Sequence, residues 1–325
     1  MDTVILPYLS PIERLMVALR NVNLPQWLYD FWSDPITFLI EKGVNRVILV
    51  GGHEPYSPPN EGTPSEDEGL DLSKMPEDER LKEEVIKNEE QLKRFFDSKK
   101  LLAKNHRGYV TAKRIWFFRF FNCRVKDSNM SSFIQCINSI IQSYDPIRII
   151  RSKSLLRRLK NCYRSLHGDF NDTSLIVYHA PIAPYRSFLS CLCIPHTVFI
   201  NPYCFYNNFM VHGNENIGQF LTGDINLNAK WTEIEKHYDS YLSRLGLTLV
   251  PHHGASKSWN RAILAKTPRK CLWVTSASIS NKYHPSFKVI KDINCNGSIH
   301  LGSNELSEIA IRRTILLETA RVIAQ

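Results

Sequence analysis

Three short polar segments between residues 220 and 286 carry side chains that could bind a metal ion. Each segment follows an apolar run typical of a β-strand. In chain order these are Leu221 before Gly223-Asp224, residues 245–250 before His252 and His253, and residues 271–275 one loop before His284. Because ligands at the carboxyl ends of neighbouring strands converge in α/β sheets, we expect these side chains to lie close together. A carboxylate with neutral imidazoles suits zinc or a similar transition metal.

The elements that must position these side chains alternate between strands and helices. A helix is predicted over 231–244, between the aspartate strand and the histidine strand, and another over 286–293. The chain begins in the same way, with a strand over 3–6, a helix from Ser10 and a buried strand over 46–50. Ser10 and the glutamate three residues later have the spacing of a capping box. This alternation predicts the α/β class.

The three segments also contain recognisable motifs. These are Thr222-Gly223-Asp224, Pro251-His252-His253-Gly254 and His284-Pro285-Ser286. In this order they resemble the second half of a metallo-β-lactamase-fold hydrolase, and are most similar to the branch that includes the C-terminal domain of the bacterial competence DNA-uptake channel. The resemblance covers residues 170–290. It implies an αββα sandwich that holds one or two zinc ions, or manganese in their place.

The resemblance also implies roles for individual side chains. By motif match, Asp224 bridges two metal ions, and His253 and His284 are terminal ligands. His252 takes the catalytic position, from which it could orient a ligand or the leaving group. Which of His252 and His253 binds the metal stays open, and His179 is a further candidate ligand. A metal held in this way lowers the pKa of a coordinated water to about 7, so that hydroxide is available at neutral pH.

One motif of the superfamily is absent. Its first metal motif, His-x-His-x-Asp-His or His-x-Asp-x-Asp-His, has no counterpart here, and among eleven histidines only His252 and His253 are close neighbours. Residues 2–7 resemble the strand that follows this motif in the family. The chain is therefore expected to be N-terminally incomplete, as a truncated product, a fragment or one piece of a split protein whose partner chain supplies the missing ligands. A degenerate copy of the motif at 7–15 is the alternative.

Composition sets the domain organisation. The 325 residues and their ordinary hydrophobic content are predicted to form a single domain over 1–325. Residues 54–98 are acidic and poor in large apolar side chains, which predicts a flexible insertion, helical in its later part over 77–99. Residues 148–164 hold seven Lys or Arg and no acid, with apolar residues at helical spacing. They predict an amphipathic helix whose cationic face could neutralise phosphates.

Charge and cysteine usage bear on partners and compartment. The formal net charge of +9 favours acidic partners such as nucleic acid or nucleotides. The eight cysteines show no paired metal spacing, and free thiols suit a cytoplasmic location. We find neither a signal pattern nor an apolar run of ~18 residues, so no membrane partner is expected.

The sequence therefore predicts a metal-dependent hydrolase of the metallo-β-lactamase fold, acting on phosphodiester or nucleic-acid substrates. The alternative is a non-catalytic remnant of that fold that serves as a binding subunit. A third hypothesis is a nucleic-acid-binding module that uses the cationic helix.

Overall fold

The computed structural model divides into two compact units. It describes residues 2–20, 22–52, 70–72, 74–112, 115–123, 127–141, 145–164, 174–182, 188–193, 209–212, 216–307 and 309–315. The first unit comprises residues 1–57, 75–108 and 121–175, and the second unit comprises 58–74, 109–120 and 176–325. Both contain helices and strands, which confirms the α/β class. The αββα arrangement stays a prediction. The single domain over 1–325 also stays a prediction, because two compact units can belong to one domain.

The first unit contains a three-stranded parallel sheet with the order β1-β2-β4. The strands are β1 (Thr3–Pro7), β2 (Arg46–Gly51) and β4 (Leu101–Asn105), and helices α1 (Pro11–Arg20) and α3 (Pro35–Glu41) connect the first two. The predicted capping box begins α1. The Ser10 N–H donates to Glu13 Oε2 at 2.7 Å, and the Glu13 N–H donates to Ser10 Oγ at 3.4 Å. Gly43, at φ +86°, follows α3 in the left-handed conformation expected after a helix.

Part of the predicted acidic insertion belongs to the core of the first unit. The helical expectation over 77–99 is confirmed by α4 (Glu79–Asn88), the 3-10 turn η1 (Glu90–Leu92) and α5 (Lys93–Asp97). The few apolar side chains of this stretch recur at helical spacing, and Leu81, Val85 and Leu92 are buried in one cluster with sheet residues. Residues 54–69 and 73 of the predicted insertion lie outside the described residues.

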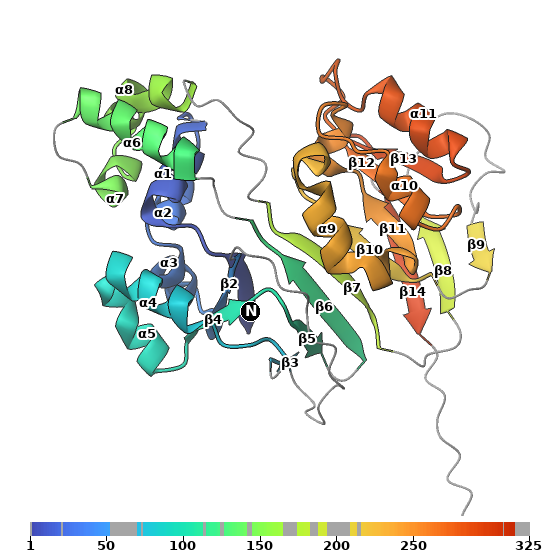
Figure 1. Ribbon diagram of the computed structural model, residues 1–325, viewed down its shortest axis with the longest axis horizontal. Helices are drawn as coiled ribbons and strands as arrows, with labels where there is room; N and C mark the ends of the chain where they lie inside the picture. The colour runs from blue at the N-terminus through green and yellow to red at the C-terminus, as the bar shows by residue number, and fades with distance from the viewer. Residues whose placement is uncertain are drawn as a thin grey trace, which may run out of the picture. The chain divides into compact units, whose positions relative to one another are not determined.

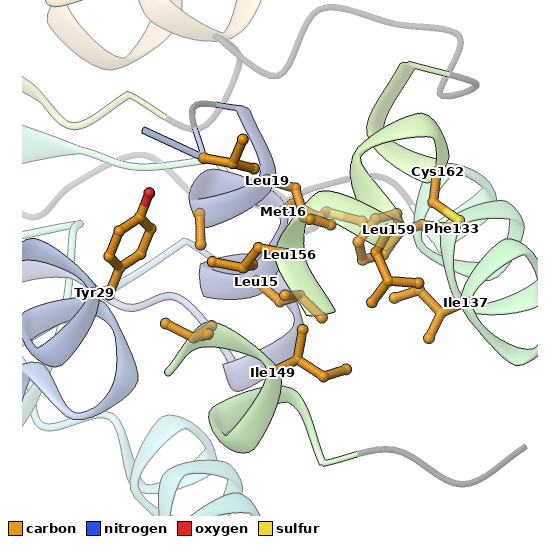
Figure 2. Close-up of a cluster of buried hydrophobic side chains, with 13 residues drawn as sticks. Leu15, Met16, Leu19, Tyr29, Phe133, Ile137, Ile149, Leu156, Leu159 and Cys162 are labelled. Carbon is orange, nitrogen blue, oxygen red and sulfur yellow. The ribbon is translucent and has the colours of Figure 1, made fainter. Parts of the chain in front are cut away.

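A second core in the first unit is built from helices. It joins α1 to α2 (Gln26–Ser33), α6 (Asp127–Ile140), α7 (Pro146–Ile150) and α8 (Lys153–Arg164). Figure 2 shows Leu15, Met16 and Leu19 of α1 facing Leu156 and Leu159 of α8. The predicted amphipathic helix is thus two helices, α7 and α8, whose apolar sides are buried. The cationic residues on their other side are exposed: Arg148, Arg151, Lys153, Arg157 and Arg158.

A disulfide bond corrects the expectation that the cysteines are free thiols. It joins Cys136 of α6 to Cys162 of α8, with their Cα atoms 5.6 Å apart. The two residues are 26 positions apart and only helix packing brings them together, so spacing along the chain carried no signal. Among the described cysteines, Cys123, Cys271 and Cys295 take part in no disulfide.

Reduction of this disulfide is expected to lower the free energy of unfolding by about 2–4 kcal/mol, because the bond closes a long loop in the unfolded chain. Urea unfolding with and without a reductant, followed by circular dichroism, measures the difference. The exchange Cys295→Ser, at an exposed free thiol, should leave both curves unchanged. Equal midpoints with and without the reductant would contradict the prediction.

The second unit contains an eight-stranded sheet with the order β13-β12-β11-β10-β7-β6-β5-β3. Its four parallel neighbours are β10 (Gly218–Leu221), β11 (Leu245–Leu249), β12 (Leu272–Ser276) and β13 (Ile299–Ser303). They are joined by α9 (Leu227–Leu242), α10 (Ala262–Lys266) and α11 (Phe287–Cys295), which Figure 1 shows beside these strands. Sequential parallel strands with helical crossovers place the loops after β10, β11 and β12 at one edge of the sheet.

The remaining strands of the second unit extend this sheet and form another. The rest of the large sheet is β7 (Ile176–Pro181), β6 (Trp116–Phe121), β5 (Tyr109–Ala112) and β3 (Leu70–Asp71). A separate three-stranded sheet contains β14 (Ala310–Ile315), β8 (Phe188–Cys193) and β9 (Phe209–His212). In the part of the chain that the structure describes, no helix has the length and apolar character needed to span a bilayer.

Candidate metal centre

The three predicted ligand loops are joined to one another through their backbones. The His252 N–H donates to the Gly223 carbonyl at 3.0 Å, and the Ser286 N–H donates to the Gly254 carbonyl at 3.0 Å. The first bond links the aspartate loop to the histidine turn, and the second links that turn to the loop of His284. The three loops therefore lie together at the carboxyl edge of the sheet.

Gly254 allows the histidine turn and the His284 loop to approach closely. Its φ is +84°, and a Cβ atom at this position would lie 2.8 Å from Pro285 Cβ and 3.1 Å from Pro285 Cα. Both the left-handed backbone and the contact require a residue without a side chain. The backbone conformation and packing of the turn therefore explain the glycine of the Pro-His-His-Gly motif.

His252 and His253 both adopt left-handed backbone conformations. Their φ values are +47° and +54°, in the turn η4 (Pro251–Gly254). For residues other than glycine this costs on the order of 1–3 kcal/mol each, and it persists only where the surroundings impose it. Here the backbone hydrogen bonds at Gly223 and Gly254 provide that constraint. The turn places the His252 ring centroid 6.3 Å from that of His253 and 5.8 Å from that of His284.

Asp224 and His253 have the spacing of two ligands to one metal ion. The His253 Nε2 atom lies 3.5 Å from Asp224 Oδ1. His253 Nδ1 donates a hydrogen bond to the Ser276 carbonyl at the end of β12, so Nε2 is the ring nitrogen that faces the aspartate. Two ligands of a tetrahedral zinc ion, bound at about 2.0–2.1 Å, are roughly 3.3 Å apart. The same distance suits an ion pair when His253 is protonated.

His284 is held neutral beside His252. Burial lowers the pKa of His284, and the neighbouring His252 and His253 rings lower it further. Its Nδ1 atom is buried and has no hydrogen-bond partner among the described residues. The His252 Nδ1 lies 3.0 Å from the Oγ of the buried Ser258, which fixes the orientation of that ring. A neutral imidazole is suited to metal binding.

The predicted ligand set is brought together only in part. Among the residues that the structure describes, no three His, Cys, Asp or Glu side chains converge at metal-binding spacing. Asp224 and His253 are at ligand distance, while His284 lies beside His252 instead of completing the pair. The donor types fit zinc. The arrangement as it stands fits a half-site of two ligands.

His179 does not belong to this set. It pairs with Gln219 inside β10, whereas Asp224 lies beyond the carboxyl end of that strand. The Trp116 Nε1–H donates to His179 Nδ1 at 3.1 Å, and the ring packs against Trp116 and Phe118. The candidate role of His179 as a ligand is therefore wrong, because its ring is engaged within the sheet.

Two groups that orient the motif histidines, Ser258 and the Ser276 carbonyl, were not predicted from the sequence. Ser258 lies only six residues after His252, so a local pattern could have indicated it. The Ser276 carbonyl had no sequence signal, since a residue of any type could supply it.

His300 on β13 gives the second unit a pH-dependent stability. Its Nε2 lies 3.0 Å from Thr275 Oγ1, and burial lowers its pKa from the ordinary value of 6.5. Below pH 6.5 the unfolded chain binds more protons at His300 than the folded chain does. The contribution of the neutral His300 ring to the free energy of unfolding is therefore complete above pH 6.5 and is lost as the pH falls. Between about pH 7.5 and about pH 5.5 we expect the wild type to lose more free energy of unfolding than His300→Gln. Urea unfolding at both pH values tests this, and equal losses would contradict it.

Comparison with known proteins gives no relative. No family model, curated protein or solved structure matches this chain. Its function has to be inferred from the chemistry of the site.

Proposed function

We propose that Asp224, His253 and His284 belong to the metal centre of a metal-dependent hydrolase of the metallo-β-lactamase type, which acts on phosphodiester or related bonds. The observation that supports this most is the pair of left-handed histidines held beside an aspartate by hydrogen bonds between three loops. Backbone strain of this kind gathers at functional sites. The resemblance of the motifs supplies the reaction class.

Each side chain would have a separate task. Asp224 and His253 would hold the ion, since their facing atoms are at ligand spacing. His284 would add a third donor through its imidazole ring, which lies beside His252. A zinc or manganese ion would act there as a Lewis acid and lower the pKa of a coordinated water. His252, oriented by Ser258, would hold or release a proton at Nε2 near the leaving group.

A metal centre needs more ligands than Asp224 and His253. Two ligands at the right spacing bind an ion weakly, so further donors have to come from outside this pair. His284 is one source within the chain, and a partner chain is another.

Metal analysis of the purified chain tests the proposal. The protein is dialysed against zinc or manganese, freed of excess ion, and analysed by mass spectrometry. Two tightly bound ions would mean a complete centre, and one weakly bound ion would mean a half-site; both support the proposal. If neither metal is retained, the chain does not bind metal by itself and the hydrolase proposal fails.

The exposed cations of α7 and α8 favour a second candidate function, the binding of nucleic acid. Arg157 and Arg158 are neighbours on the solvent side of α8, with no acidic residue between 146 and 164 to neutralise them. Phosphates would be bound there through counterion release, and affinity would fall steeply with salt.

The double exchange Arg157→Glu and Arg158→Glu is expected to weaken binding to double-stranded DNA at least about tenfold and to lower the salt slope by about 2. Fluorescence anisotropy at several salt concentrations measures both. The matched control reverses another exposed basic pair, Arg269→Glu and Lys270→Glu. Equal effects of the two double exchanges would show that only net charge matters.

A further inference from the structure

Two aromatic side chains flank His284 and lie largely in solvent. Tyr283 is 81% exposed and Phe287 is 78% exposed, more than any other large hydrophobic side chain that the structure describes. Tyr283 directly precedes His284, with Cα atoms about 3.8 Å apart, and Phe287 is the first residue of α11. The two exposed rings therefore belong to the loop that carries a proposed metal ligand.

Hydrogen bonds hold the backbone of this loop on both sides of His284. The Tyr283 N–H donates to Asn281 Oδ1 at 2.9 Å. The Ser286 N–H donates to the Gly254 carbonyl of the histidine turn at 3.0 Å. Because the backbone is already fixed, a ligand that contacts the two rings has less conformational entropy to remove.

The surroundings of the two rings are cationic. A lysine adjoins each ring in the sequence, and both of these lysines, Lys282 and Lys288, are exposed. The chain has no Asp or Glu between residues 251 and 291, a range that includes the histidine turn and the whole His284 loop. On the turn after β13, Glu305 carries an acidic group, and its carboxylate accepts a hydrogen bond from the Ile279 N–H at 2.9 Å. Aromatic rings between basic side chains suit a ligand with planar groups on an anionic backbone.

We propose that Tyr283 and Phe287 stack against unpaired bases of a nucleic-acid strand whose phosphodiester reaches the candidate metal centre. This inference rests on the proposed function, because it names the substrate of that site. Every base offers a planar face to an aromatic ring, and stacking of this kind is typical of proteins that bind single strands. In a duplex the faces of the bases are covered by their neighbours, so the rings favour unpaired nucleotides. Lys282 and Lys288 contact the backbone phosphates.

Strand binding by the metal-free protein tests the stacking platform without hydrolysis of the probe. The full chain is treated with EDTA, and an oligothymidine strand is compared with an abasic strand of the same length by fluorescence anisotropy at one salt concentration. The abasic strand keeps every phosphate and lacks only the bases, so the ratio of the two affinities measures stacking apart from charge. We expect the oligothymidine strand to bind at least about tenfold more tightly than the abasic strand. Equal affinities would overturn the proposal.

Exchanges at the two exposed rings locate the site. The double exchange Tyr283→Ala and Phe287→Ala should abolish the preference for the oligothymidine strand and leave the affinity for the abasic strand unchanged. Tyr283→Phe should retain the preference, because the hydroxyl group takes no part in stacking. The matched control is Trp27→Ala, at an aromatic side chain of the first unit that is 57% exposed, and it should leave the preference intact. A double variant that keeps the preference, or a control that loses it equally, would overturn the proposal.

The same variants separate this inference from the metal centre and from a protein contact. Because no metal is present, a base preference that depends on Tyr283 and Phe287 supports the stacking platform even where the chain retains no zinc, and the hydrolase proposal alone then fails. Analytical ultracentrifugation shows whether the two rings contact a second copy of the chain instead. If the double exchange dissociates an oligomer and leaves the base preference unchanged, the surface is a protein contact and the stacking platform is overturned.

Discussion

Replacing Asp224 by Asn is expected to lower metal-dependent hydrolysis of bis(p-nitrophenyl) phosphate by at least about a hundredfold and to release bound zinc. The exchange keeps the shape of the side chain but removes the anionic oxygen that faces His253 Nε2 at 3.5 Å. Loss of an outer-shell partner alone typically costs 10- to 100-fold in affinity or activity, and loss of a direct ligand should cost more. Initial rates and metal content of the same preparations measure the two effects.

The matched control is Asp239→Asn. Asp239 lies on α9 of the same unit, is 66% exposed, and pairs with Lys266 at 3.3 Å. An exposed ion pair of this kind contributes little, so both rate and metal content should be unchanged. If Asp224→Asn keeps the wild-type rate, Asp224 is not a ligand and the proposed centre is wrong. If it keeps the metal but loses the rate, Asp224 acts on the substrate.

The exchange Gly254→Ala is expected to destabilise the second unit by about 2–5 kcal/mol. A left-handed conformation costs an alanine roughly 1–2 kcal/mol, and forcing its Cβ against Pro285 adds overpacking of roughly 1–3 kcal/mol. Relief of the contact would separate the histidine turn from the His284 loop. The variant should therefore also bind less metal than the wild type. The loss of bound metal should be at least as large as the fraction of the protein that is unfolded.

Gly43→Ala separates the two costs of that exchange. Gly43 has almost the same backbone conformation, at φ +86°, but nothing lies within 4 Å of an added Cβ. Only the conformational cost of roughly 1–2 kcal/mol should appear there. Urea unfolding of both variants gives the comparison. Unfolding of the first unit is followed for Gly43→Ala and unfolding of the second unit for Gly254→Ala. Equal losses would mean that the contact between Gly254 and Pro285 is not tight.

Where local chemistry decides a structure, the sequence was enough. Ser10 and Glu13 cap α1 as their spacing predicts, since both partners lie within one turn. The apolar runs before Asp224, His252 and His284 form β10, β11 and β12, because such runs bury most readily as strands of a parallel sheet. The helix α2 (Gln26–Ser33) was not predicted. Its aromatic-rich sequence has only modest helix propensity, and packing of Tyr29 into the helical core stabilises it.

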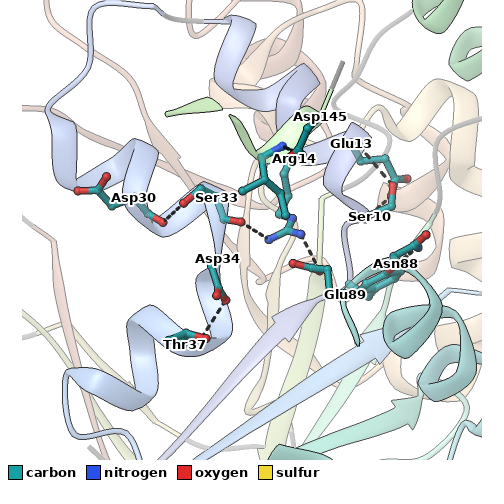
Figure 3. Close-up of polar contacts among 12 residues, drawn as sticks. Ser10, Glu13, Arg14, Asp30, Ser33, Asp34, Thr37, Asn88, Glu89 and Asp145 are labelled. Carbon is teal, nitrogen blue, oxygen red and sulfur yellow. Dashed lines mark hydrogen bonds and ion pairs between the residues drawn. The ribbon is translucent and has the colours of Figure 1, made fainter. Parts of the chain in front are cut away.

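Contacts between distant segments were decided by the tertiary structure. The bond between Cys136 and Cys162 depends on how α6 packs on α8, and the buried ion pair of Arg14 and Glu89 joins residues far apart in the chain (Figure 3). Neither leaves a periodic or local pattern, because the distance between two side chains on different elements is set by the crossing of those elements. Sequence spacing therefore cannot report it.

The candidate site divides in the same way. By itself the sequence determined which residue types gather at the carboxyl edge of β10–β12, because parallel strands with helical crossovers place their following loops together. Only the tertiary structure decided that Asp224 faces His253, that His284 lies beside His252, and that His179 is engaged within the sheet. The reason is that a strand pattern determines which edge a loop occupies, whereas side-chain direction depends on the turn that follows. Here that turn holds two histidines in a left-handed conformation, which no spacing of residues could have indicated.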